Sequence, residues 1–186
     1  TMRRVAVSDL EKIFKSESGR VLATLMRILR DLDLAEEALQ ESFSAALVTW
    51  RQNGIPDNPY GWLVSAGKFK AIDTIRRSDH GKALLKDLHL HREAGEPIDQ
   101  ENQYIEKYLV HDDQLRLIFL CCHPRLSMEA RICLSLRELC GLSTKEIARG
   151  LLTSPENIKK RISRAKNLIK DEKIPYGIPD KDHLDE

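Results

Sequence analysis

Apolar residues recur at intervals of three and four positions along most of this chain, which is the spacing of one face of an α-helix. No alternating pattern of useful length indicates a β-strand, and no internal repeat is present. The predicted fold class is therefore all-α, with two small helical domains joined by a flexible linker and a helix-turn-helix in the second domain. The expected helices cover residues 8–31, 33–50, 59–77, 114–122, 127–140, 144–151 and 155–171.

Helix starts are marked by residues that cap free backbone amides. Ser8, Asp33 and Ser143 each precede a glutamate by three positions, which is the pattern of a capping box. Asn58 followed by Pro59 combines a cap with a proline in the first helical turn. These signals predict a first domain over 1–80, a linker over 81–111, a second domain over 112–174 and a tail over 175–186.

The polar segment 79–111 differs from the helical segments on either side of it. It contains Gly95 and Pro97, and a short helix is expected there only over 82–90. Four histidines lie in this segment at irregular spacing, namely His80, His89, His91 and His111. The irregular spacing favours a solvated linker over a metal site or a pH sensor.

Positive and negative charges almost cancel, with 30 Lys and Arg against 29 Asp and Glu and a net charge of +1. This total argues against a uniformly basic nucleic-acid-binding protein, but the charges are segregated along the chain. Residues 31–41 carry only acidic charges, which suits either a solvated face or a docking face for a basic partner. The chain has no apolar run of membrane-spanning length and no apolar signal region after its N-terminus, so we expect a cytoplasmic protein without membrane contacts.

The segment 143–171 has the pattern of a helix-turn-helix, with a tight turn before Ser154 and Pro155. Residues 155–173 hold seven basic and three acidic residues, a local net charge of +4. Such a helix suits a major groove, because Arg bonds guanine while Lys and the helix N-terminus hold phosphates. A solvated charged face is the alternative. The expected inward stripe is Ile158, Ile162, Ala165 and Ile169.

The expected helix over 59–77 combines basic residues with Tyr60, Trp62 and Phe69. Aromatic rings near cations suit single-stranded nucleic acid, whose bases stack on rings while cations follow the phosphates. The alternative is that Trp62 and Phe69 belong to the core, and for Phe69 the core interpretation is favoured.

The four cysteines, at positions 121, 122, 133 and 140, are expected to be reduced and to behave as small buried residues. Cys121, Cys122 and His123 are adjacent and lack the usual gap between zinc ligands. Neighbouring helical residues also point in different directions, which disfavours a thiol–imidazole pair. We therefore predict no catalytic residue, metal or cofactor, and a zinc or thiol enzyme is only a distant alternative.

Three motifs together resemble the bacterial extracytoplasmic-function sigma factors of RNA polymerase. The segment 33–43 resembles the family's "D-x-A-E-D-x-x-Q-E-x-F" signature, and Trp62-Leu63 with 73–77 resembles its "W-L … D-x-x-R-R" segment. Residues 144–165 resemble its C-terminal helix-turn-helix. The motifs occur in the family's order over about 150 residues, with a linker where the family has one.

The resemblance implies two helical domains that bind core RNA polymerase and direct it to promoters, without a reaction of their own. The implied polymerase contacts are Asp33, Glu36, Glu37, Gln40 and Glu41. The implied contacts with the melted minus-ten element are Asn53, Asn58, Trp62, Lys68, Lys70, Arg76 and Arg77, of which the asparagines lie at the family's base-capturing loop. The implied contacts with the duplex minus-thirty-five element are Ser154, Asn157, Lys159, Lys160, Arg161 and Arg164.

Two features distinguish this chain within the family. Phe69 stands where the family usually has a polar residue, so no base-reading role is carried over to it. Residues 54–59 and 117–124 resemble a subgroup with a C-terminal helical extension, which is then missing here. That extension or an anti-sigma factor is the expected regulator. The rival interpretation is an autonomous helix-turn-helix regulator that binds duplex DNA as a dimer.

Overall fold

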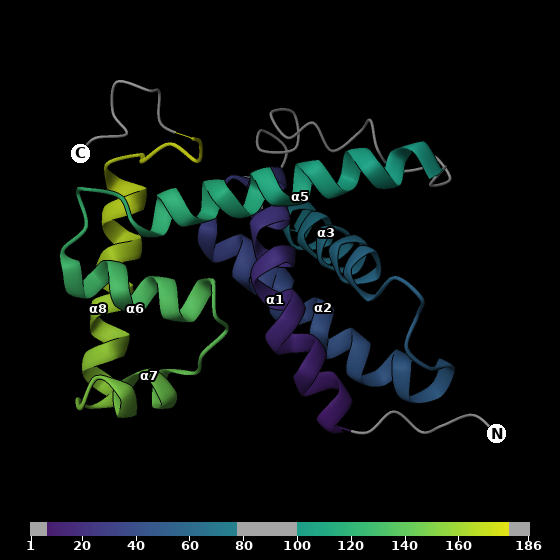
Figure 1. Cartoon of the computed structure of the whole chain (residues 1–186), viewed down its shortest axis with the longest axis horizontal. Coiled ribbons are helices and arrows are strands. Elements are labelled where there is room, and N and C mark those ends of the chain that lie inside the picture. The colour runs from purple at the N-terminus through teal and green to yellow at the C-terminus, as the bar shows by residue number, and fades with distance from the viewer. Residues whose placement is uncertain (1–6, 78–99, 179–186) are drawn as a thin grey trace.

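The computed structural model describes residues 7–77 and 100–178, and all the regular structure in these ranges is helical (Figure 1). This confirms the predicted all-α class. The N-terminal body consists of α1 (Val7–Leu29), α2 (Leu32–Asn53) and α3 (Pro59–Arg77). The C-terminal body consists of α5 (Gln100–Cys121), α6 (Met128–Glu138), α7 (Thr144–Gly150) and α8 (Pro155–Asp171).

Local capping explains where several helices begin. The Asn58 side chain accepts a hydrogen bond from the Gly61 amide at 2.9 Å, so it caps α3 as predicted. Ser143 and Glu146 form the predicted reciprocal capping box at the start of α7. At α2 the prediction was wrong by two residues, because Asp31 caps the helix through the Leu34 amide.

Two further boundaries differ from the sequence expectation. Helix α1 already includes Val7, so Ser8 lies inside the helix instead of capping it. Helix α5 begins at Gln100, within the segment assigned to the linker. Its first two turns contain Gln100, Glu101, Gln103 and Glu106, which are residue types that favour a helix. The expected short helix over 82–90, with His80, His89 and His91, lies outside the described residues.

The core of the N-terminal body forms where α2 and α3 pack on α1. Trp50 is buried, and its ring meets that of Trp62 edge to face, with 5.2 Å between the ring centroids. Between the two helices, Gly54 ends α2 with a φ of 85°, a conformation that favours glycine. The tight end of α2 and the cap at Asn58 fix the loop that joins the two helices.

The two bodies pack against each other. Helix α5 runs over α1 and continues to α6, so it belongs structurally to both parts of the molecule (Figure 1). Leu117 and Leu120 of α5 lie in the same hydrophobic cluster as Leu22 and Leu25 of α1. The C-terminal body is therefore held on the N-terminal body by buried apolar contacts as well as by the polar contacts described next.

Candidate functional site

Acidic side chains line the outer face of α2. Asp33, Glu37, Gln40 and Glu41 are exposed there, at the helical spacing that keeps them on one side. The opposite side of α2 is buried against α1 and α3, through residues such as Ala35 and Phe43. This arrangement leaves a negatively charged strip available to a basic partner.

Glu36 is the exception among the five acidic-face residues. Its side chain is only 14% exposed, because the ammonium group of Lys166 in α8 forms an ion pair with it. The same ammonium lies 3.6 Å from an Asp33 carboxylate oxygen. Helix α8 therefore covers one edge of the acidic strip.

Helix α3 and the loop before it present aromatic and basic groups together. Asn53 and Asn58 flank the loop and are both exposed, while Trp62 is half-buried against Trp50. Lys70 and Arg76 are exposed further along the helix. Lys68 is half-buried, and the Arg77 side chain lies outside the described residues.

Phe69 projects from the same helix, and the prediction that it belongs to the core was wrong. Its side chain is 71% exposed, whereas Ala71 and Ile75, which follow it, face the interior. Trp62, Phe69 and Arg76 are each seven positions apart, so they lie along one outward strip of α3. A large exposed ring between cations is a suitable surface for stacking with an unpaired base.

Helix α8 has the predicted amphipathic form. Ile158, Ile162, Ala165 and Ile169 are all buried, which confirms the inward stripe. Ser154 caps the helix through the Asn157 amide, and Pro155 occupies the first turn. The polar residues expected at the DNA are on the other side. Ser154, Asn157, Lys159, Lys160 and Arg164 are exposed, and Arg161 is half-buried.

The turn between α7 and α8 brings the helix N-terminus to the surface. Leu152 in this turn has a φ of 50° and is almost fully exposed, and the Thr153 amide bonds back to the Ala148 carbonyl. The first turns of α8 are thus free to approach a groove with their basic side chains.

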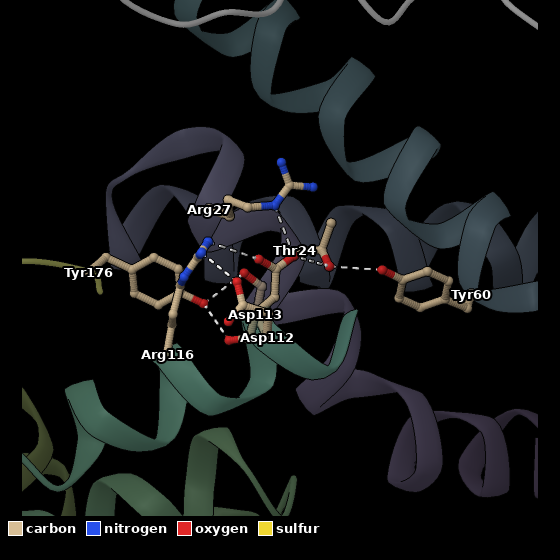
Figure 2. A network of polar contacts seen from close by, with 8 residues as sticks. Thr24, Arg27, Tyr60, Asp112, Asp113, Arg116 and Tyr176 are labelled. Carbon is tan, nitrogen blue, oxygen red and sulfur yellow. Dashed lines mark hydrogen bonds and ion pairs between the residues drawn. The ribbon is translucent and has the colours of Figure 1, made fainter. Parts of the chain in front are cut away.

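A polar network joins the two bodies at Asp113 of α5, whose side chain is only 1% exposed (Figure 2). Its carboxylate accepts hydrogen bonds from Thr24 at 3.0 Å and from Arg27 at 2.9 Å, both in α1. Since Thr24 donates to Asp113, Tyr60 of α3 donates to Thr24 at 2.8 Å. Burial raises the pKa of Asp113, and the hydrogen bonds and charges of Arg27, Thr24 and Arg116 oppose this shift.

Tyr176, which follows α8, completes this network. Its hydroxyl lies 2.9 Å from the carbonyl oxygens of both Ala23 in α1 and Asp113 in α5, and its one hydrogen is shared between them (Figure 2). Burial raises the pKa of the Tyr176 phenol, with a further contribution from the Asp113 charge. Asp113 and Tyr176 were not predicted, because a lone Asp and a Tyr in a Pro-rich tail carry no local sequence signal.

A second buried carboxyl, Glu138, lies at the end of α6. Its pKa is raised from 4.5 to about 8, mainly by burial and then by the nearby Glu36 carboxylate. Lys166 and Arg137 oppose this shift. Glu138, Glu36 and Lys166 therefore bring together α6, α2 and α8 in one charged cluster.

The Cys-Cys-His segment lies at the end of α5 and in the turn that follows it. Cys121 is buried, and burial raises the pKa of its thiol, while His123 accepts a hydrogen bond from the Arg125 amide. Cys121 and Cys133 are buried as expected, but Cys122 and Cys140 are exposed, so the expectation was wrong for these two.

Within residues 7–77 and 100–178, no group of three His, Cys, Asp or Glu side chains could hold a metal ion. No helix of the described chain has the length and apolarity to cross a membrane.

Two family models match the two bodies in order. The model of sigma-70 region 2 matches residues 13–81, and the model of sigma-70 region 4 matches residues 116–169. The first covers most of α1 to α3, which carry the acidic strip and the aromatic-basic helix. The second covers the helix-turn-helix, including α8.

Comparisons with curated proteins give relatives that align along most of this chain. The chain is 37% identical over 173 residues to an uncharacterized protein of Rhizobium meliloti, covering 89% of this chain and 39% of that protein. It is 27% identical over 169 residues to the ferric citrate uptake sigma factor FecI of Escherichia coli, covering 90% and 92%. It is 24% identical over 157 residues to the probable extracytoplasmic-function RNA polymerase sigma factor SigI of Mycobacterium tuberculosis, covering 84% and 53%.

The chain thus spans about two fifths of the Rhizobium protein and about half of SigI, but nearly all of FecI. The matches to region 2 and region 4 fall on separate helical bodies of this chain. This chain belongs to the sigma-70 family of RNA polymerase sigma factors, as a member of the extracytoplasmic-function type.

Proposed function

We propose that this chain binds core RNA polymerase through the acidic strip of α2 and directs it to promoters through α3 and α8. The observation that carries the proposal is the segregation of charge onto three surfaces of a chain that is nearly neutral overall. The acidic strip is Asp33, Glu36, Glu37, Gln40 and Glu41, and four of these five side chains are exposed. Members of this family are not enzymes, which agrees with the prediction of no catalytic site.

The two basic helices have separate roles in this proposal. Helix α8 enters the major groove of the minus-thirty-five element with its N-terminal turns, where Asn157 and Arg161 face the bases and Lys159 faces phosphate. The α2–α3 loop and the outward strip of α3 hold the melted minus-ten strand. Extrusion of a base costs a few kcal/mol, and stacking with neutralisation of phosphates offsets that cost.

Charge reversal tests the docking surface. Changing Glu37→Lys together with Glu41→Lys should abolish the capture of core polymerase, because it replaces attraction to a basic partner with repulsion. Both side chains are exposed, so helical content measured by circular dichroism should stay unchanged. Glu11→Lys, at an exposed position of α1, is the matched control and should bind normally. Normal capture by the double variant would refute the docking assignment.

Transcription in vitro with core polymerase and a promoter library tests the whole proposal. A sigma factor yields transcripts that start at a fixed distance from a shared pair of elements. An autonomous regulator would instead bind duplex DNA as a dimer and yield no transcript with core polymerase alone. Because polymerase and promoter DNA both lie in the bacterial cytoplasm, the proposed function places the chain there.

The proposed regulator is an anti-sigma factor or a C-terminal extension that covers the C-terminal body. Leu115 and Ile118 of α5 and Met128 and Ile132 of α6 support this, since they leave apolar side chains exposed. Changing Ile118→Glu with Ile132→Glu should release a bound regulator without loss of core polymerase capture. Retention of the regulator by this variant would place the regulator elsewhere.

A further inference from the structure

A cavity of about 490 Å³ lies where α1 and α2 face the end of α6 and the start of α7. This volume is within the range of roughly 300–1,000 Å³ that is typical of pockets for small organic molecules. One part of the lining is apolar and consists of Phe14, Leu22, Leu39 and Leu142. The proposed contacts with polymerase and promoter DNA leave this cavity without a ligand, and its polar lining indicates which chemical class fits it.

Two buried polar atoms of the lining have no hydrogen-bond partner within the described chain. Ser18 in α1 is 3% exposed, and its hydroxyl oxygen is one of these atoms. Glu138 at the end of α6 is 5% exposed, and its Oε1 atom is the other. Arg137 Nε lies 3.6 Å from this carboxylate oxygen, which is too far for a hydrogen bond. An unpaired buried polar atom is costly, so a ligand that donates to these oxygens would gain affinity.

The Ser18 hydroxyl has free space beside it. Gly141 also lines the cavity, and a Cβ atom at this glycine would lie 2.9 Å from the hydroxyl oxygen. The absence of a side chain at Gly141 therefore leaves room for a ligand atom. Ser18 and Glu138 meet at the same junction of helices, because a Cβ atom at Gly19 would lie 3.4 Å from the Glu138 carbonyl oxygen.

Carboxyl groups outnumber cations in the lining of this cavity. Its four carboxyl groups are Glu11, Glu36, Glu138 and Glu146, and its two cations are Lys15 and Arg137. Burial and the neighbouring Glu36 carboxylate raise the pKa of Glu138 to about 8. A cation bound beside Glu138 would take the place of its proton, whereas a bound anion would face more negative than positive groups.

The two cations of the lining are poorly suited to hold an anion. The Arg137 guanidinium donates a hydrogen bond to the Thr144 hydroxyl at 3.3 Å, and its Nε atom faces Glu138. Lys15 is exposed to water, which weakens its attraction for a ligand charge. The unpaired acceptors are thus the polar groups that are free to select a ligand.

We propose that this cavity binds a small organic amine, whose ammonium group donates hydrogen bonds to the Glu138 carboxylate and the Ser18 hydroxyl. An ammonium group has three donors and no acceptor, which suits two unpaired acceptor oxygens. The apolar body of the amine packs on the leucines and on Phe14, whose ring is otherwise exposed to water. The site belongs to the free chain, and it does not rest on the proposed function.

Calorimetric titration of the full chain at pH 8 with three indole compounds tests the ligand class. Tryptamine carries an ammonium group, tryptophol carries a hydroxyl group in its place, and indole-3-propionate carries a carboxylate. Tryptamine should bind at one site per chain and about tenfold more tightly than the other two, because hydrogen bonds between charged groups are the stronger ones. The proposal is overturned by equal affinity for tryptamine and tryptophol, by tighter binding of indole-3-propionate, or by no saturable binding of tryptamine at millimolar concentrations.

Two substitutions locate the bound ammonium group. Glu138→Gln removes a charge and keeps the shape of the side chain, so it should lower the affinity for tryptamine to that for tryptophol. Damage to the cavity would instead weaken the binding of both compounds equally, and that result contradicts the contact with Glu138. Ser18→Ala removes one neutral acceptor and should weaken the binding of tryptamine by about two- to tenfold.

The matched controls are Glu37→Gln and Ser44→Ala, at exposed positions of α2 outside the lining. Both controls should bind tryptamine like the wild type, and circular dichroism should show the same helical content in all four variants. Unchanged affinity for tryptamine in both Glu138→Gln and Ser18→Ala overturns the site, because tryptamine would then bind elsewhere on the chain.

Discussion

Helices α3 and α8 are both basic, but they present their charges in different ways. In α8 every buried position is aliphatic, and exposed cations alternate with small polar residues around the free side. In α3 the outward strip contains the rings of Trp62 and Phe69, with the exposed cations Lys70 and Arg76 nearby. Recognition of base edges in a groove requires a helix that carries hydrogen-bond donors. Recognition of unpaired bases requires flat rings on which the bases stack.

The difference teaches that positive charge alone does not identify the form of DNA that a helix binds. Both helices neutralise phosphates, so both contribute to a salt-dependent affinity. The residues between the cations decide what is recognised. The following predictions use the chain bound to core polymerase, with a duplex probe and with a probe whose minus-ten strand is unpaired.

The largest effect is expected on the duplex side. Changing Arg161→Ala with Arg164→Ala should weaken binding to the duplex probe by roughly 1–3 kcal/mol per lost contact, which is about 5-fold to 150-fold each. The affinity for an unpaired minus-ten strand that lacks the upstream duplex should stay the same. Lys170→Ala, near the other end of α8, is the control and should behave like the wild type. Equal losses of affinity for both probes would show that α3 and α8 do not recognise different forms of DNA.

The next effect concerns the exposed ring of α3. Phe69→Ala should weaken binding to the unpaired probe by about 1–3 kcal/mol, because a base loses its stacking surface. Phe69→Trp should keep the affinity, while Phe69→Leu, which is apolar but not flat, should lose it. The duplex probe should bind all three variants equally. If Phe69→Leu binds like the wild type, apolar contact explains the residue and stacking does not.

Helices α3 and α8 also differ in how well the sequence predicted which of their side chains are buried. The stripe of α8 and its cap at Ser154 follow from residues within one or two turns, so spacing was sufficient to predict them. Phe69 has the same helical spacing as core residues. Its exposure depends on which side of α3 packs on α1 and α2, and no residue near it carries that information.

Contacts between distant segments were the least predictable part of the molecule. Asp113 bonds residues 86 and 89 positions earlier, and Tyr176 bonds a carbonyl 153 positions earlier. The Glu36–Lys166 pair likewise links two helices whose surfaces each looked solvated in the sequence. Helix types, caps and the order of the two bodies are local properties, whereas the packing of the two bodies on each other follows from tertiary contacts alone.

A third expected effect concerns the buried carboxyl of Glu138, which lies near Lys166 of α8. Burial raises the pKa of Glu138 in the folded chain to about 8, from the 4.5 of an ordinary glutamate. The folded state therefore binds more protons between these values, and the free energy of unfolding falls as the pH rises through this range. The Glu138→Gln side chain cannot ionise, so the variant should be more stable than the wild type at pH 8.

Thermal unfolding at pH 5 and pH 8 measures this gain. At pH 5 Glu138 is already protonated, so the midpoints of the variant and the wild type should nearly coincide. At pH 8 the variant should unfold at a higher temperature. Glu37→Gln, at an exposed position of α2, should show no such pH-dependent difference. A variant that is equally or less stable at pH 8 would show that Glu138 is ionised in the fold and held by Lys166 and Arg137.

The smallest expected effect is a change in the salt dependence of DNA affinity. It distinguishes α3 from α8 by the form of DNA that each helix contacts. Lys70→Ala and Lys159→Ala each remove one exposed cation, and both are expected to weaken binding evenly across sequences. Counterion release is smaller on a single strand than on a duplex, so the slope of log affinity against log salt should fall by about 0.7 for Lys70 and about 0.9 for Lys159. Each change should appear only on its own probe, because the other helix keeps its phosphate contacts. Identical changes on both probes would mean that α3 and α8 hold the same stretch of duplex.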